Sequence, residues 1–247
     1  MAEFAVILPA AGKSSRFADK EKKPFAVLDG RAVWLRTAEL FVNRNDVTEV
    51  LIVVSPDDTE RFKQRYAANM AFMNVRVALG GKERFDSVAN ALAMVGPQAK
   101  YVAIHDAVRP CVTTEQIDAV FGAAKQFGAA FLAAKITDTV KRVGAGQKVH
   151  ETVAREGLWL AQTPQVFRRD WLDEAYARRE ALGQTITDDA QLVEALGKPV
   201  YAVEGTSENV KITKKGDLAL AAAILKARPE PKAARPIHPF ADEEMWK

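Results

Sequence analysis

The sequence predicts an α/β protein with a doubly wound, mostly parallel sheet and a projecting β-arm. Short runs rich in Val and Ile lack a clean alternation of apolar and polar residues, which is typical of strands covered on both faces. Longer amphipathic helical patterns lie between these runs, as expected for right-handed βαβ units. One polar, glycine-punctuated stretch interrupts the alternation and predicts the arm.

The first half of the chain supplies most of the expected sheet. Apolar runs predict strands at residues 4–9, 49–54, 75–79, 101–105 and 129–134. Amphipathic patterns predict helices at residues 32–44, 57–68, 84–95 and 114–126. Because ligands bind at the carboxyl ends of strands in such sheets, we expect the functional loops to follow Leu8, Leu79 and Ile104.

The pattern changes at Thr137. Residues 137–159 are β-rich and polar but have too few apolar side chains for a core of their own, so they predict a two-stranded arm that packs on another surface, such as a second subunit. The expected elements after the arm are helices at 169–182, 188–196 and 216–227 and a strand at 200–203. We therefore expect one domain from residues 1–136 and 160–227, an arm at 137–159, and a flexible Pro-rich tail at 228–247.

Composition excludes several classes of protein. The 247 residues carry a formal charge of only +3, which is too small for a typical nucleic-acid-binding surface, and aromatic residues do not alternate with cations. Apolar residues make up 48% of the chain, yet no run approaches the roughly 18–20 residues of a membrane span. With a single cysteine, Cys111, and no cationic segment at the N-terminus, we expect a cytoplasmic protein without a signal peptide, nucleic-acid partner or membrane contact.

The loop after the first predicted strand indicates a phosphate-rich ligand. Residues 10–16 read Ala-Ala-Gly-Lys-Ser-Ser-Arg, and Lys22 and Lys23 follow. Small residues let backbone N–H groups approach a ligand closely, and the cations favour a polyanion such as a nucleoside triphosphate. The loop matches neither the Gly-x-x-x-x-Gly-Lys-Ser/Thr motif nor the dinucleotide motif Gly-x-Gly-x-x-Gly.

Two further loops follow predicted strands. Gly80-Gly81 precedes a helix that begins near Arg84 and contains Ser87, so the backbone and the helix N-terminus can both face a ligand. The sequence His105-Asp-Ala-Val-Arg109 offers a carboxylate and a cation three residues apart. Asp106 and Arg109 either bind a ligand or form an ion pair that holds the loop.

These motifs form an ordered series with several later ones, and the series resembles the 2-C-methyl-D-erythritol 4-phosphate cytidylyltransferase family of the non-mevalonate isoprenoid pathway. The resemblance runs from residue 4 to about residue 226 and includes, besides the three loops, Thr137-Asp-Thr-Val-Lys141, Thr163-Pro-Gln165, Ile186-Thr-Asp188 and Asn209-Val-Lys211.

The resemblance implies a Rossmann-like domain, a homodimer joined by the β-arm, and Mg²⁺-dependent transfer of CMP from CTP. It assigns charge stabilisation to Arg16, Lys23 and Lys211, and the nucleotide site to Ala10, Ala11, Gly12, Gly81 and Ser87. It assigns the sugar phosphate to Asp106, Arg109, Thr163 and Thr187, with Thr139 and Arg155 of the arm reaching the partner subunit's substrate. The metal would be held mainly by phosphate oxygens, with Asp106 as the candidate carboxylate.

This chain departs from the family pattern at three places. Ser14 stands where the family commonly has Gly, which bears on the geometry of the loop. The segment Lys22-Lys23-Pro24 stands where the family commonly reads Pro-Lys-Gln; alignment on Phe25 and Gly30 matches Lys23 to the catalytic lysine and leaves Lys22 as a second candidate. Lys82 stands where some members carry an Asp near the base, so no base recognition is assigned to it.

Three other functions remain open at the level of sequence. A cytidylyltransferase for another polyol phosphate, such as ribitol 5-phosphate, would share the fold, the CTP site and the arm. A transferase for another nucleotide or a sugar acid would differ in base recognition. A non-catalytic nucleotide-binding module would bind CTP without turnover, but it would have no use for the combination of Arg16, Lys23 and Lys211.

Overall fold

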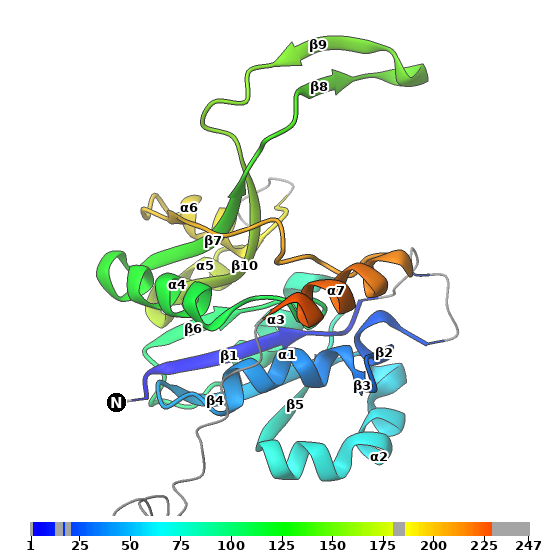
Figure 1. Cartoon of the computed structure of the whole chain (residues 1–247). Coiled ribbons are helices and arrows are strands. Elements are labelled where there is room, and N and C mark those ends of the chain that lie inside the picture. Colours follow the sequence, from blue (N-terminus) through cyan, green and yellow to red (C-terminus); the bar gives the residue numbers. More distant parts are fainter. Residues whose placement is uncertain (1, 13–16, 18–20, 180–185, 229–247) are drawn as a thin grey trace, which may run out of the picture.

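A computed structural model describes residues 2–12, 17, 21–179 and 186–228. Its centre is a seven-stranded sheet in the order β11-β7-β10-β6-β1-β4-β5. The strands span β1 Phe4–Pro9, β4 Val47–Val54, β5 Val75–Leu79, β6 Tyr101–Ile104, β7 Ala129–Lys135, β10 Trp159–Arg168 and β11 Tyr201–Glu204. All neighbours pair in parallel except β10, which is antiparallel to both β6 and β7. The predicted doubly wound, mostly parallel α/β fold is confirmed (Figure 1).

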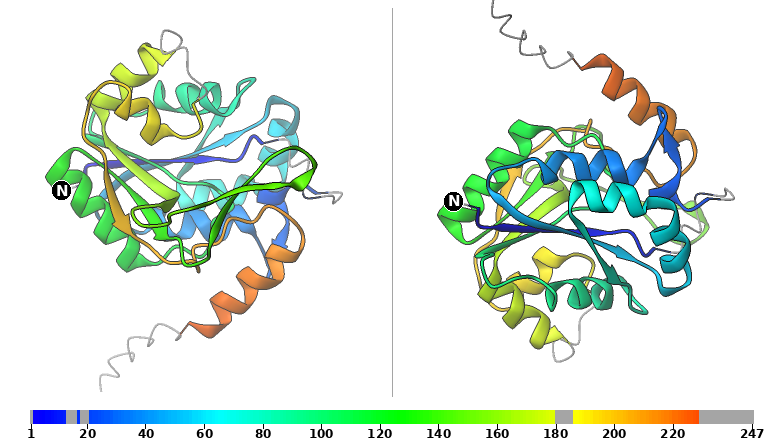
Figure 2. Two further views of the ribbon diagram at one scale, coloured as in Figure 1. Left: turned by 90° about the horizontal axis from the view of Figure 1, so that it is seen from above. Right: turned by 90° about the horizontal axis from the view of Figure 1, so that it is seen from below.

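Helices cover both faces of this sheet. One face packs on α1 (Val33–Val42), α2 (Pro56–Met73) and α4 (Thr114–Phe127), whose Trp34, Phe62 and Phe121 side chains are buried with alternate residues of β1. The other face packs on α3 (Arg84–Leu92), α5 (Arg169–Ala177) and α6 (Asp189–Glu194). The two views of Figure 2 show α1 and α4 on one side of the sheet and α3, α5 and α6 on the other. Burial on both faces explains why the strands read as continuous apolar runs.

A third, smaller apolar cluster lies beside the sheet. The C-terminal helix α7 (Gly216–Ala227) packs over the hairpin of β2 (Val27–Leu28) and β3 (Arg31–Ala32), and buries Cys111 between them. The short η1 turn (Lys23–Phe25) precedes this hairpin; it begins at the candidate cation Lys23, and Lys22 is its N-cap. Among the described residues, no helix combines the length and apolar character needed to cross a membrane.

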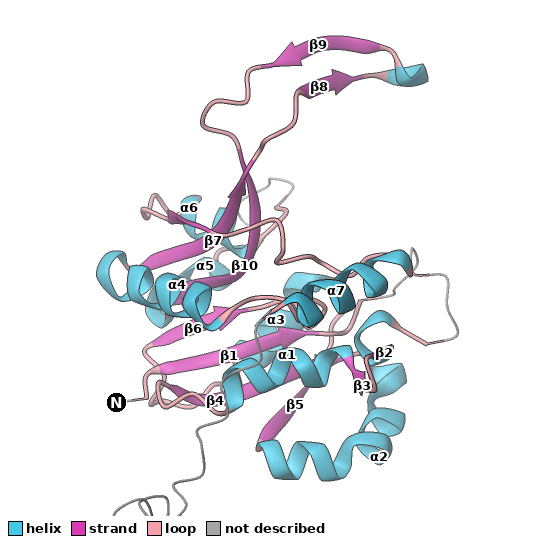
Figure 3. Cartoon of the chain, viewed as in Figure 1, coloured by secondary structure: helices cyan, strands magenta, loops and turns pink. Residues whose placement is uncertain are grey.

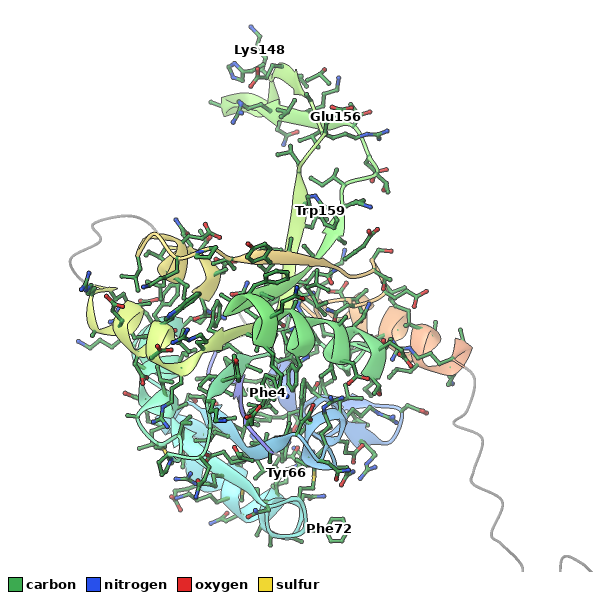
Figure 4. All side chains as sticks on the ribbon, turned by 90° about the vertical axis from the view of Figure 1, so that its left-hand side faces the viewer. Phe4, Tyr66, Phe72, Lys148, Glu156 and Trp159 are labelled. Carbon is green, nitrogen blue, oxygen red and sulfur yellow. The ribbon has the colours of Figure 1, made fainter. Side chains whose placement is uncertain are left out.

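The strands β8 (Val140–Val143) and β9 (Val149–Val153), with the η2 turn Ala145–Gln147 between them, form a two-stranded ribbon inside the segment predicted as an arm. Figure 3 shows the ribbon rising from the ends of β7 and β10. In Figure 4, Lys148 and Glu156 stand away from the main body, with Trp159 lower on the arm. Most of its side chains are exposed, among them Val143 and Val149.

Two of the helices after the arm have bounds that differ from those predicted from the sequence. The helix predicted at 188–196 begins at Asp189, because the Asp188 side chain accepts a hydrogen bond from the Gln191 N–H and so acts as its N-cap. The helix predicted at 169–182 ends at Ala177, and residues 180–185 lie outside the described part. Likewise, apart from Arg228, the predicted tail lies outside it.

Strand β10 was not predicted. It is long and central, but it carries Gln162, Thr163 and Gln165 around Pro164, and its pairing register with β7 shifts between Ala161 and Gln165. These polar side chains are buried and bonded to other loops, so neither alternation nor a continuous apolar run marks the strand.

Candidate active site

A cavity of about 650 Å³ opens at the carboxyl ends of β1, β4, β5 and β6. Loops that follow these four strands line it, together with the η1 turn and the segment after β11. Its lining residues include Pro9, Ala10, Ala11, Gly12, Lys22, Lys23, Ser55, Asp57, Gly81, Lys82, Glu83, Arg84, Ser87, Asp106 and Lys211. The three loops predicted to be functional, after β1, β5 and β6, therefore line one cavity, and the loop after β4 lines it with them.

Small residues form one wall of the cavity. Ala10, Ala11 and Gly12 follow β1, and a side chain at Gly80 would meet the Cβ of Ala11 at 2.6 Å. A side chain at Gly81 would meet the Cβ of Asp86 at 2.3 Å, so both glycines are required for this close approach. The Gly81 N–H donates to Ser87 Oγ at 3.0 Å. Ser87 therefore shapes the glycine turn in addition to lining the cavity.

The predicted catalytic lysines line this cavity. Lys23 enters it from η1 and Lys211 from the segment after β11. Lys22 also lines it, but its Nζ is paired with Asp58 Oδ2 at 2.5 Å. Arg16, which was predicted to act beside Lys23, lies outside the described residues.

Asp106 lies between two cations. Its Oδ2 accepts from Lys211 Nζ at 2.9 Å and from Arg109 Nε at 3.1 Å. Burial by itself would raise the pKa of Asp106, but Lys211, Arg109 and nearby Arg84 outweigh it and hold this pKa well below the usual range. The carboxylate is therefore ionised at neutral pH. Of the two alternatives that the sequence left open, the ion pair is present, and Asp106 also lines the cavity; ligand binding by Asp106 and Arg109 stays a prediction.

Hydrogen-bond contacts with Thr163, His105 and Asn209 hold the Asp106 loop in place. Thr163 Oγ1 accepts from the Asp106 N–H at 3.1 Å and lies 3.1 Å from His105 Nδ1. His105 Nε2 lies 3.1 Å from the Arg109 carbonyl oxygen. Burial lowers the pKa of His105 to about 4, so it is a neutral hydrogen-bonding side chain at pH 7. Arg109 Nη1 in turn donates to the Asn209 carbonyl oxygen at 2.7 Å, which links the loop to the segment of Lys211.

Arg84 is a cavity residue to which the sequence analysis gave no role. Its Nη2 donates to Asp189 Oδ2 at 2.6 Å, and the Tyr176 hydroxyl donates to Asp189 Oδ1 at 2.6 Å. Burial would lower the pKa of Arg84, but the fully buried Asp189 outweighs it and raises this pKa, which keeps the cation charged. Its position four residues after Gly80 was the sequence signal that could have placed Arg84 near the ligand. Its partner Asp189 lies 105 residues away in the chain, so the pair itself had no such signal.

A second cavity of about 320 Å³ lies at the base of the arm. Arg109 and Asn209 line it together with Thr137, Asp138 and Gln162, and Lys211 lines both cavities. Asp106 lines the first cavity, Arg109 the second and Lys211 both, so this cluster links the linings of the two cavities.

Four predicted substrate residues line neither of these two cavities. Thr163 is buried beneath Asp106, and the Thr187 hydroxyl donates to Gln191 Oε1 at 3.2 Å. Thr139 is exposed on the arm, and Arg155 donates to the carbonyl oxygen of Thr137. A single chain therefore does not bring Thr139 or Arg155 to either of these two cavities.

No group of three or more His, Cys, Asp or Glu side chains is arranged as a metal site in the part of the chain that the structure describes. Cys111 has no role at the cavity: burial raises the pKa of its thiol to about 11, so the nucleophilic thiolate is scarce at neutral pH.

Comparison with known proteins agrees with this geometry. Residues 4–227 match the family model for 2-C-methyl-D-erythritol 4-phosphate cytidylyltransferase. The chain is 41% identical over 236 residues to the enzyme of that name from Rhodopirellula baltica, covering 91% of this chain and 95% of the relative. It is 38% identical to the Pelotomaculum thermopropionicum protein of the same name, covering 92% of this chain and 96% of that one.

Solved structures show the same relationship. The 4-diphosphocytidyl-2C-methyl-D-erythritol synthase of Anaerococcus prevotii superposes with a TM-score of 0.78 at 29% identity, covering 91% of this chain and 96% of that one. The cytidylyltransferase of Thermus thermophilus superposes with a TM-score of 0.73 at 33% identity, covering 89% and 98%. Because the family model spans residues 4–227 and the similarity to these relatives and structures extends over most of the chain, the chain belongs to the 2-C-methyl-D-erythritol 4-phosphate cytidylyltransferase family.

Proposed function

We propose that this protein transfers CMP from CTP to 2-C-methyl-D-erythritol 4-phosphate, which gives 4-diphosphocytidyl-2-C-methyl-D-erythritol and pyrophosphate. The observation that carries the proposal is the Asp106–Arg109–Lys211 cluster, which links the lining of a glycine-walled, cation-rich cavity to the lining of a second cavity. A reaction that joins a nucleotide to a phosphorylated polyol needs two adjoining binding sites with cations between them.

The chemistry explains the residues at this junction. A phosphate monoester has its second pKa near 6, so it is largely a dianion at pH 7 and its oxygen attacks without a general base. The attack on the α-phosphorus of CTP proceeds in line, and pyrophosphate leaves. The obstacle is the repulsion between two polyanions and the charge that builds up in the transition state, which preorganised cations and backbone donors offset.

Each predicted residue has a place in this scheme. Ala10, Ala11, Gly12, Gly81 and Ser87 hold cytidine and its phosphates at the small-residue wall. Lys23, Lys211 and Arg16 stabilise charge on the reacting phosphates. Asp106 accepts from a hydroxyl of the polyol, and Arg109 binds its phosphate. Thr163 supports their loop, and Thr187 supplies a further hydroxyl to the sugar phosphate.

The arm completes the site from a second subunit. A two-stranded ribbon is marginally stable by itself in water, and this one exposes Val143 and Val149. Packing of each arm on the other protomer covers these side chains and carries Thr139 and Arg155 to the partner subunit's polyol phosphate. The active form is therefore a homodimer.

Mg²⁺ fits the donor set of the cavity. Mg²⁺ keeps several waters and uses one or two carboxylates plus substrate phosphates, and the cavity offers Asp106, whose low pKa keeps it ionised. Both protein cations lie on Oδ2 of this carboxylate. When bound, the metal would be held mainly by phosphate oxygens and would neutralise charge on the triphosphate; Asp106 is its candidate carboxylate ligand, as the alternative to accepting from the polyol hydroxyl.

The buried thiol of Cys111 fits a reducing compartment such as the cytoplasm.

Release of pyrophosphate from CTP, Mg²⁺ and 2-C-methyl-D-erythritol 4-phosphate tests the proposal. We expect turnover with this acceptor and at least tenfold less with ribitol 5-phosphate, because two acceptors that differ in their carbon chain meet the Asp106 and Arg109 groups differently. UTP and GTP in place of CTP test the base. Higher kcat/KM with ribitol 5-phosphate would favour the alternative acceptor, and CTP binding without turnover would indicate a binding module.

A further inference from the structure

The segment 21–25, which carries Lys23, is attached to helix α2 at three points. Glu21 forms an ion pair with Arg65. The Phe25 ring packs on Phe62 and Tyr66, with ring centroids 5.6 and 6.3 Å away. Lys22 supplies the third attachment, at the first turn of α2. Figure 4 labels Tyr66 in the body of the protein, far from the arm.

The third attachment is a three-residue cluster at the edge of the nucleotide cavity. Lys22 Nζ lies 2.5 Å from Asp58 Oδ2 and 3.4 Å from Ser55 Oγ, and Ser55 Oγ donates to the same Asp58 oxygen at 2.5 Å. Lys22 and Ser55 both line the cavity. Only 31% of the Lys22 side chain and 21% of the Asp58 side chain are exposed, so water screens this pair less than a surface pair.

We propose that Lys22, Ser55 and Asp58 form a latch that holds the η1 turn against α2 and thereby positions Lys23 for the reaction. Lys22 is then a positioning residue, although it lines the cavity beside Lys23. This inference rests on the proposed function, because Lys23 is the charge stabiliser that the latch serves.

Two observations favour the latch over direct binding of substrate by Lys22. Its ammonium group already has a carboxylate partner at hydrogen-bond distance, so a phosphate would have to displace Asp58. Burial by itself would raise the pKa of Asp58, but Lys22 and Ser55 outweigh it and lower this pKa, as a stable pair requires. Lys23 follows directly in the chain, so a shift of Lys22 moves the backbone of Lys23 as well.

Steady-state kinetics of Lys22→Met, Asp58→Asn and the double variant test the latch. We expect each single variant to lower kcat about tenfold at saturating CTP and polyol phosphate, since a small displacement of a charge stabiliser is costly. The KM for CTP should stay within about twofold, and the double variant should lose about tenfold and not about a hundredfold, because both changes remove one interaction. Lys22→Arg keeps the cation and should retain most of kcat.

The control is Glu60→Gln, which removes an exposed pair with Lys63 on the same helix and should leave kcat unchanged. Thermal melts check that each variant is folded; should Asp58→Asn fail to fold, Ser55→Ala replaces it with a smaller loss of kcat. A wild-type kcat for Asp58→Asn would overturn the latch, and so would multiplicative losses in the double variant. A raised KM for CTP in Lys22→Met alone would make Lys22 a direct ligand. An inactive wild-type protein would instead contradict the proposed function.

Discussion

Lys211 Nζ lies 2.9 Å from Asp106 Oδ2, and this contact joins the segment after β11 to the loop after β6. Lys211 also lines both cavities. We expect Lys211→Met to lower kcat by on the order of 10²–10³-fold, because it removes a preorganised charge from the junction. Measurement of pyrophosphate release tests this, with Lys214→Met, an exposed lysine three residues on, as the control. A kcat within a few-fold of wild type would contradict the role given to Lys211.

Lys23 is expected to act on the transition state more than on binding. Lys23→Ala should lower kcat by on the order of 10²-fold or more, as for loss of one preorganised charge stabiliser. The KM for CTP should change much less. Lys63→Ala, which removes an exposed lysine from α2, provides the matched control. Near-normal turnover of Lys23→Ala would shift the catalytic assignment to Lys22.

Arg155 is expected to act on the partner subunit's substrate. Arg155→Ala should raise the KM for the polyol phosphate about tenfold or more and leave the KM for CTP nearly unchanged. The reason is that the arm is proposed to contact the polyol phosphate and not CTP. Mixed dimers of Arg155→Ala and Lys23→Ala chains should regain activity, since each dimer then has one site with both residues intact. Equal effects on the two KM values, or mixed dimers without activity, would count against a shared site.

The Arg84–Asp189 pair is expected to matter for stability. Asp189 is fully buried and 31% of the Arg84 side chain is exposed, so Asp189→Asn leaves a partly buried guanidinium without its countercharge and should cost about 3 kcal/mol in the free energy of unfolding. Urea denaturation measures this loss. Asp170→Asn, which removes an exposed pair with Arg168, should cost less than about 1 kcal/mol. Similar values for the two variants would show that the buried pair contributes little.

His105 predicts how stability depends on pH. Its pKa falls from 6.5 to about 4 on folding because it is buried, so between these values the unfolded chain binds a proton that the folded chain does not. The free energy of unfolding therefore decreases as the pH falls from 6.5 to 4, by up to about 3 kcal/mol from this group. Urea midpoints at pH 7 and pH 4.5 measure the slope. His105→Gln should flatten it, whereas His150→Gln on the exposed arm should not; equal slopes in all three proteins would refute the assignment.

Most strands and helices could be predicted because the apolar runs and helical patterns that define them lie within short stretches of the sequence. Strands β1 and β5 have the bounds that their apolar runs predict, and α7 begins and ends at the expected residues. Strand β10 could not be predicted, because its buried Gln162 and Gln165 depend on partners 47 and 23 residues away. The start of α6 depends on the cap at Asp188, which a helical pattern does not distinguish from the first turn.

The sequence by itself determined most of the sheet strands and helices, the small-residue and cationic loops at strand ends, and the family, since these depend on residue types at short spacing. Only the tertiary structure decided which distant side chains meet. It paired Arg84 with Asp189, brought Lys211 to Asp106, and tied Lys22 to Asp58 beside Lys23. Such contacts depend on how the sheet brings its loops to one edge, and no spacing along the chain contains that information.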